Sequence, residues 1–371
     1  MALRLVLLAL ALACAGSAAA RQPRSLRILP PVWLPFLLWA GWAALAIIWS
    51  VEPGRSAKEF RNEIVYAGLA YFVCYIGAQA PRAARIFLPV AGAATTLLCA
   101  IAIYSFPQGN EHYQVGWHGG SGDLSSALLV LMPCVLVAGW HGTRAGYAKA
   151  LHLSLALAGL ILVAAYTTLN RTVWIGFAAE MVLLAGLLIT REGAADRRRI
   201  RTAGVVLALA VIAGCALVSV RVQAQREAMD PAASLTSERR IKLWPEVLQQ
   251  IEQRPLTGYG FGRGLLRGTF TEELNEPILW HAHNFFLDIA LQTGLPGLAL
   301  FLLLLGAIAR EGWRALRSGD GMRMACGLAL FGVLTGMVVR NMTDTLLVRQ
   351  NALLFWALVG VLLAGARRPA T

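Results

Sequence analysis

Charged residues are scarce in this chain of 371 residues, since only 14% of them are Asp, Glu, Lys or Arg while 57% are hydrophobic. Soluble domains carry about 25% charged residues. The shortage argues against an ordinary soluble domain and fits a chain that spends most of its length in hydrocarbon. Internal repeats and long low-complexity tracts are also absent from the sequence.

Cysteines are few and show no paired spacing. All six lie within long apolar stretches, where a cysteine packs as a small apolar side chain. The sequence therefore gives no sign of a disulfide framework, and it says little about the redox compartment. The six are Cys14, Cys74, Cys99, Cys134, Cys215 and Cys326.

Long apolar stretches dominate the chain. A bilayer crossing needs about 20 mostly apolar residues, and eleven such stretches follow one another. Apolar residues run round every face of them rather than alternating, which predicts helices and not a β-barrel. The predicted fold class is therefore all-α, a polytopic transmembrane helical bundle of about 11 spans. The spans cover residues 3–20, 32–50, 63–79, 86–106, 123–140, 149–166, 171–190, 203–220, 284–309, 323–340 and 351–366.

The net charge of +13 is not gathered into one nucleic-acid-binding patch. Basic residues return instead in every second connector between spans, and the positive-inside rule assigns these connectors to the cytoplasm. The remaining connectors then face outward, including the long segment 221–283. The basic connectors hold Arg21, Arg24, Arg27, Arg82, Arg85, Arg144, Lys149, Arg191, Arg197, Arg198, Arg199, Arg201, Arg310, Arg314, Arg317, Arg323, Arg367 and Arg368.

This topology divides the chain into an N-terminal transmembrane bundle (1–220), a large periplasmic loop (221–283) and C-terminal transmembrane helices (284–371). It also puts Met1 outside. Cleavage of the first span as a signal peptide would leave Arg21 outside and invert every later loop, against the charge pattern. We therefore favour a retained first helix. A start downstream of a missing first span stays open as an alternative.

The outer loop contains one amphipathic stretch. Its apolar residues recur with helical spacing, which predicts a helix that lies on the membrane face with its apolar side down. Ser237 is the expected N-cap, and Pro255 ends the run. The apolar stripe consists of Ile241, Trp244, Val247, Leu248 and Ile251.

A glycine-rich segment, Gly258-Tyr-Gly-Phe-Gly-Arg-Gly264, follows that helix. Glycines allow successive backbone N–H groups to turn inward and cradle an anion. No Gly-Lys-Ser/Thr follows, so the segment is not a P-loop. A tight connector is the favoured interpretation, and an anion-binding loop is the alternative.

Two histidines, His281 and His283, precede the ninth predicted span. They are two positions apart, so on a helix they would point to different faces. A metal site would need further ligands at matching spacing, which only Glu111, His112 and His118 of an earlier outer loop could add. We therefore predict no metal. His283 is interpreted as a general base, because a neutral imidazole can take a proton from a hydroxyl near pH 7. A structural role is the alternative.

Several motifs together resemble the O-antigen ligase and O-antigen polymerase family of bacterial membrane glycosyltransferases. The His-Asn pair followed after nine residues by a Gly-x-x-Gly is similar to the ligase signature, and an Arg-x-x-x-Trp block with a glycine-rich block lies upstream. The resemblance extends over about residues 40–365. The motifs are His283-Asn284 with Gly294-Leu-Pro-Gly297, Arg240-Ile-Lys-Leu-Trp244, Arg254-Pro-Leu-Thr-Gly-Tyr-Gly-Phe-Gly262, Asn170-Arg-Thr-Val-Trp174, Trp49-Ser-Val-Glu-Pro53 and Asp344 in Asn341-Met-Thr-Asp344.

The resemblance implies a bacterial inner-membrane enzyme, usually with twelve spans, whose active site faces the periplasm. It implies a glycan donor on undecaprenyl diphosphate, an acceptor hydroxyl on lipid A–core or on another glycan, and inverting transfer without metal or cofactor. His283 would be the base. Arg171 and Arg240 would bind the diphosphate, since arginine forks onto phosphate oxygens. Asn284 would bind substrate.

Asp344 is the other substrate-binding candidate, and it could instead pair with Arg340 one helical turn earlier. Asp123, at the start of the fifth predicted span, is a candidate for acceptor contact. Ligase is favoured over polymerase. A lipid-linked glycan transporter is the rival from another class, but it would favour internal repeats and midplane charge, whereas these motif charges lie at the outer face.

Overall fold

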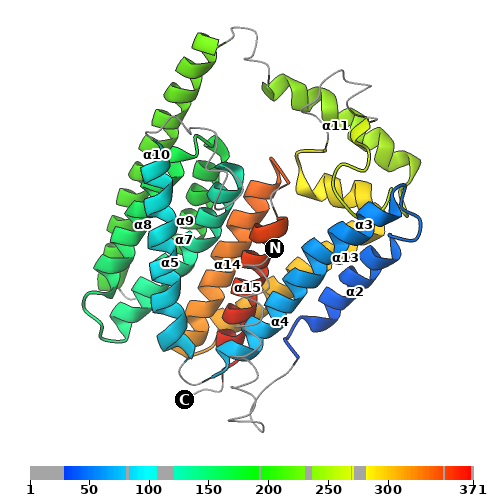
Figure 1. Ribbon diagram of the computed structural model, residues 1–371. Helices are drawn as coiled ribbons and strands as arrows, with labels where there is room; N and C mark the ends of the chain where they lie inside the picture. Colours follow the sequence, from blue (N-terminus) through cyan, green and yellow to red (C-terminus); the bar gives the residue numbers. More distant parts are fainter. Residues whose placement is uncertain are drawn as a thin grey trace.

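The computed structural model describes residues 29–80, 83–106, 121–191, 194–229, 236–268, 270, 281–345 and 347–368. The predicted first span and residues Glu111, His112 and His118 lie outside these ranges. Within them, all regular secondary structure is helical (Figure 1). The all-α fold class is therefore confirmed for the described part of the chain.

Eight helices in the described ranges are long and apolar enough to cross a membrane. They correspond to eight of the eleven predicted spans, because long apolar runs satisfy their backbone hydrogen bonds internally only as helices. The helices that contain them are α5 (Ala83–Ser105), α7 (Ser121–Arg144), α8 (Ala150–Thr167), α9 (Arg171–Ile189), α10 (Ala194–Met229), α13 (Phe285–Leu316), α14 (Gly321–Asn341) and α15 (Arg349–Ala366).

Two further predicted spans take a different form. The stretch 32–50 forms a short apolar helix, α2 (Trp33–Leu45). The stretch 63–79 belongs to a longer rod in which α3 (Pro53–Phe60) continues through a π-helical turn, η1 (Arg61–Val65), into α4 (Tyr66–Ala78). The π turn carries Arg-Asn-Glu, which interrupts the apolar run. The predicted count of about eleven spans is thus not confirmed.

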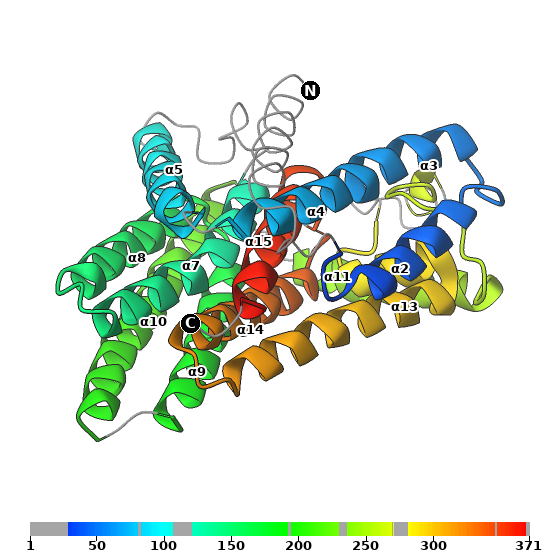
Figure 2. The ribbon, with the colours of Figure 1, turned by 90° about the horizontal axis from the view of Figure 1, so that it is seen from below.

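Two hydrophobic cores fill the bundle, and their helices spread to either side of α14, which itself contributes Leu330, Val333 and Met337 to the first core (Figure 2). One joins α2, α4, α13 and α15 around stacked aromatic rings such as Trp39 and Trp356. The other joins α5, α7, α8, α9 and α10. Glycines permit the closest approaches, since a Cβ at Gly360 of α15 would lie 2.5 Å from the carbonyl oxygen of Tyr71 in α4. Such small residues favour tight helix packing in lipid.

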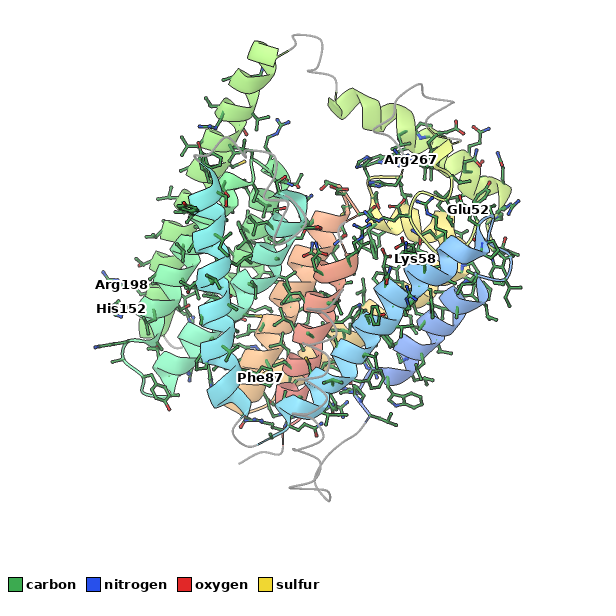
Figure 3. The ribbon with its side chains drawn as sticks, viewed as in Figure 1. Glu52, Lys58, Phe87, His152, Arg198 and Arg267 are labelled. Atoms are coloured by element: carbon green, nitrogen blue, oxygen red, sulfur yellow. The ribbon has the colours of Figure 1, made fainter. Side chains whose placement is uncertain are left out.

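The basic connectors that the structure describes meet at one end of the bundle, which we call the basic end. There, arginine side chains bond to the ends of neighbouring helices, as the positive-inside pattern predicts for connectors on one side of a membrane. Figure 3 shows Arg198 and His152 toward this end and Lys58 toward the other. The bonds run from Arg191 to the Leu316 carbonyl (2.7 Å), from Arg323 to the Ala366 carbonyl (3.0 Å) and from Arg367 to the Glu311 carboxylate (2.7 Å).

The three-region division of the sequence stays a prediction. The predicted boundary at residue 220 falls inside α10, and the N-terminal helix α4 packs against the C-terminal helix α15. The opposite end of the bundle, where α9, α13 and α15 begin and α14 ends, is called the site end below.

Candidate active site

Asn284 fixes the start of α13. Its side-chain oxygen accepts hydrogen bonds from the backbone N–H groups of Phe286 (3.0 Å) and Leu287 (3.2 Å), which have no partner within the helix. This oxygen is therefore engaged in an N-cap. The predicted substrate-binding role of Asn284 stays a prediction and depends on its amide nitrogen.

His283 lies immediately before that cap with a left-handed backbone, φ +48°. Such a conformation is uncommon for a non-glycine residue, and it occurs at functional sites where the surroundings hold it in place. Only two other non-glycine residues of the described ranges share it, Leu169 (φ 50°) and Arg349 (φ 49°). Both lie at the beginnings of helices, α9 and α15, so all three lie at the site end.

The imidazole of His283 faces the carboxylate of Asp344, with 3.4 Å between Nδ1 and Oδ1. Asp344 also accepts from the backbone N–H of Thr345 (2.8 Å). Burial alone would raise the pKa of Asp344. The neighbouring His283 side chain, the positive charge of Arg340 and the bond from the Thr345 backbone outweigh burial and hold that pKa well below its ordinary value. Asp344 is therefore an ionised partner for His283.

Arg340 is not the closest partner of Asp344. Its guanidinium donates to the hydroxyl of Thr172 at 2.7 Å and approaches that of Thr343 at 3.4 Å. Its charge still contributes to the low pKa of Asp344. Of the two roles considered for Asp344, the geometry thus favours orientation of a neighbour, His283, over a simple pair with Arg340.

His281 stands beside His283 rather than on another helix face. The ring centroids are 3.9 Å apart, and Nδ1 of His281 accepts the backbone N–H of His283 at 3.0 Å. The prediction that the two side chains diverge is wrong. It assumed a helix through both residues, whereas α13 begins only at Phe285.

Asp288 is a site residue that the sequence analysis missed. The residue is 2% exposed, and its carboxylate accepts from the backbone N–H of Ala282 (3.0 Å) and from the hydroxyl of Thr345. It therefore joins the segment that carries His283 to the segment that carries Asp344. A carboxylate in the first turn of an apolar helix is costly in a membrane, so an acidic residue at this position could have indicated a functional site from the sequence.

The Gly294-Leu-Pro-Gly297 motif breaks α13. Gly294 has φ +69°, and Pro296 has no N–H to give to the carbonyl of Gln292. The N–H of Leu295 turns to the carbonyl of Pro255 instead, at 2.7 Å. The break thus frees the carbonyls of Leu291 and Gln292 for partners outside the helix.

The glycine-rich segment supplies those partners. The backbone N–H groups of Tyr259 and Gly260 donate to the carbonyls of Leu291 (3.0 Å) and Gln292 (2.9 Å). The N–H of Gly262 donates to the side chain of Gln292 at 2.9 Å. A Cβ at Gly260 would lie 2.1 Å from the Ser50 hydroxyl. Because these amides are engaged, the segment acts as the tight connector and not as an anion cradle.

The predicted outer helix is α11 (Thr236–Gln253), which ends before Pro255 as predicted and begins before Ser237. Its packing differs from the prediction, because Leu243, Val247 and Ile251 are buried in a core shared with α13, while Leu248 is 48% exposed. The helix therefore docks on the start of α13. The indole N–H of Trp244 donates to the carbonyl of Ala282 at 3.0 Å.

Of the two predicted diphosphate ligands, the structure describes the side chain of Arg171 but not that of Arg240. Arg240 belongs to α11, one turn before Trp244, and its side chain lies outside the described part of the structure. Arg171 begins α9 and is exposed, after an Asn170 cap that accepts from Thr172 N at 3.1 Å. The Thr172–Arg340 bond holds this helix start against the end of α14.

Arg263 is a further arginine at the site end that the sequence analysis did not single out. Its guanidinium donates to the carbonyl of Thr345 at 3.0 Å, next to Asp344. Asp123 also lies at this end, where it accepts from Gln350 (2.6 Å) and Asn351 (3.2 Å) and ties α7 to α15. Its predicted contact with an acceptor stays a prediction.

The described residues contain one cluster that could hold a metal ion. His281, His283 and Asp344 can each offer a ligand atom, and these atoms lie within 4.8 Å of one another. The cluster cannot be predicted from the sequence, because Asp344 reaches the histidines only through the fold. Nδ1 of His281 already accepts a backbone hydrogen bond, and this reduces its availability as a ligand.

The fold and this cluster define a multi-pass membrane protein with a histidine–carboxylate site among arginines at one end of its bundle. Residues 153–302 match the family model described as O-antigen ligase. The chain is also 24% identical to an O-antigen ligase of Pseudomonas aeruginosa, in an alignment of 329 residues that covers 86% of this chain and 75% of the relative. These matches support the resemblance to the O-antigen ligase family that the sequence motifs indicate.

Proposed function

We propose that this chain is a membrane glycosyltransferase that transfers a glycan from undecaprenyl diphosphate to a sugar hydroxyl. More narrowly, we propose an O-antigen ligase of the bacterial inner membrane that joins O-polysaccharide to lipid A–core. The pairing of His283 with an ionised Asp344 carries the proposal. A periplasmic site is supported by the basic connectors at the opposite end of the bundle, which the positive-inside rule assigns to the cytoplasm.

His283 would act as the general base. With Nδ1 directed to Asp344, Nε2 is the nitrogen that takes the proton of the acceptor hydroxyl, and the carboxylate stabilises the resulting imidazolium. The acceptor oxygen forms a bond to the anomeric carbon as the bond from that carbon to the phosphate oxygen breaks. The diphosphate leaves with the bonding electron pair, and attack from the opposite face inverts the anomeric centre.

Arginines would stabilise the departing diphosphate, which carries concentrated negative charge. Arg171 is exposed at the start of α9, where an unpaired cation would be costly without a role. Arg240 lies on the helix that docks on Ala282 through Trp244. A guanidinium forks onto phosphate with two donors, which an ammonium cannot do.

The test is transfer of an undecaprenyl-diphosphate-linked glycan by purified protein in detergent, with lipid A–core and a free glycan offered as separate acceptors. His283→Ala should slow transfer by about 10²–10⁴-fold, the usual contribution of a general base, while donor binding persists. His152→Ala at the basic end is the matched control. Arg240→Ala should weaken donor binding as well, and Arg240→Lys should rescue poorly. Wild-type transfer by His283→Ala would overturn the base assignment and favour a transporter.

Orientation has its own test. In a background without native cysteines, Lys58→Cys and Arg198→Cys place single thiols at exposed positions near the site end and the basic end (Figure 3). A membrane-impermeant reagent applied to spheroplasts should label the first thiol at once and the second only after lysis. The reverse pattern would place the site in the cytoplasm, where the proposed reaction would not find its acceptor.

A further inference from the structure

An elongated apolar groove lies between α7, α8, α9 and α10, away from the active site. Its cavity volume is about 160 Å³. The lining is aliphatic along most of its length and becomes polar only where Thr143 and Arg144 contribute. Among the described residues, no acidic side chain lines it. A groove of this kind matches an amphiphile, with one polar end and an apolar body.

The polar end lies at the basic end of the bundle. Arg144 is the last residue of α7, whereas Leu136, Met181 and Leu207 line the groove nearer the middle of their helices. Arg144 and Leu136 are eight residues apart on α7, which corresponds to a length of about 12 Å along the helix axis at about 1.5 Å per residue. Half of the hydrocarbon core of a bilayer is about 15 Å. The groove therefore extends through about one leaflet.

Positive charge surrounds the polar end. The guanidinium of Arg144 lies 5.5 Å from the Trp140 ring, which directs it along the wall of the groove. Arg198 and Arg201 are exposed on the first turns of α10, and Figure 3 shows Arg198 toward the same end. An anionic headgroup would be attracted to these nearby arginines.

The apolar body is suited to an acyl chain and not to water. Apolar cavities of about 150 Å³ remain dry and accept apolar ligands instead. The wall is open at Gly204, where a Cβ would meet no atom within 4 Å. We propose that this groove binds one acyl chain of an anionic phospholipid of the leaflet at the basic end, with its phosphate against Arg144. The site does not depend on the proposed glycosyl transfer.

Binding can be measured by native mass spectrometry of the purified full chain in detergent, titrated with phosphatidylglycerol and with phosphatidylcholine of the same acyl chains. The wild type should retain phosphatidylglycerol at least about tenfold more strongly. Arg144→Gln should remove this preference. Ala185→Trp and Gly204→Leu fill the groove from two different helices and should each abolish retention.

Val182→Trp is the matched control, because Val182 lies one turn before Ala185 on α9 and is 74% exposed. It should retain phosphatidylglycerol as the wild type does. Equal retention by all variants, or equal binding of the two lipids by the wild type, would overturn the proposal. Displacement of phosphatidylglycerol by an equimolar amount of undecaprenyl phosphate would also overturn it, because the groove would then belong to a polyprenyl chain.

Discussion

The carboxylate of Asp288 accepts a hydrogen bond from the hydroxyl of Thr345, 57 residues further along the chain. The same carboxylate accepts from the backbone of Ala282, next to His283. One buried side chain thus holds the His283 segment that precedes α13 against the Asp344 segment that follows α14. The separation of the proposed base and its carboxylate partner depends on this contact.

Asp288→Asn should therefore lower kcat for glycan transfer by about 10²-fold with little change in donor affinity, since small displacements of a reacting group cost about that much. Thr345→Val should act in the same direction and more weakly. Ser318→Ala, which removes a hydroxyl at the basic end, is the control. An unchanged kcat in both site variants would mean that other contacts position His283.

Acid should destabilise the wild type more than Asp344→Asn. The folded-state pKa of Asp344 is depressed, so its contribution to stability is complete above the ordinary carboxyl value of about 3.9 and is lost as pH falls toward the folded-state value. Thermal unfolding in detergent between pH 6 and pH 3 measures this. If the two proteins lose stability in parallel, the interaction of Asp344 with His283 contributes nothing to folding.

Gly294→Ala should lower the free energy of unfolding by about 1–3 kcal/mol, because a side chain there is strained at positive φ. Its Cβ would also lie 2.5 Å from the Leu256 backbone. Gly306→Ala in the same helix is the matched control. There the added methyl group meets nothing within 4 Å, and alanine should stabilise the helix by up to about 1 kcal/mol. Thermal melts of both variants test the difference.

Glycan transfer should survive exhaustive chelation. His281, His283 and Asp344 offer only three ligand atoms, one of the imidazoles already accepts a backbone bond, and the charged groups around them are mostly arginines. Activity is measured before and after dialysis against EDTA. Loss of transfer that a divalent ion restores would convert this cluster into a metal site.

Sequence patterns predicted those features that depend on local composition. Eight spans, the end of α11 before Pro255 and the family all follow from runs of apolar residues or from linear motifs. The short length of α2 and the continuous α3–η1–α4 rod could not be predicted from such patterns. Their apolar runs are short or interrupted by charge, and tertiary packing decides such cases.

The site was only partly foreseeable for a related reason. His283 and Asp344 were recognised separately through motifs, but their contact requires the start of α13 to meet the end of α14. No motif in the sequence marks Asp288 or Arg263. Their hydrogen-bond partners are backbone groups or hydroxyls of other segments. Such contacts become visible only once helices are packed.

The break at Gly294 also separates the start of α13, beside the proposed catalytic site, from the part of the helix that is long enough to cross a membrane. From Leu295 to Leu316, α13 has 22 residues and measures about 33 Å, enough to cross a hydrocarbon core of about 30 Å unaided. The ten residues from Phe285 to Gly294 are then available to stand at the headgroup level. A mismatch between the bilayer thickness and the length of Leu295–Leu316 would be accommodated by tilt of that part of α13. The rate of glycan transfer should therefore vary little between bilayers of short and long acyl chains.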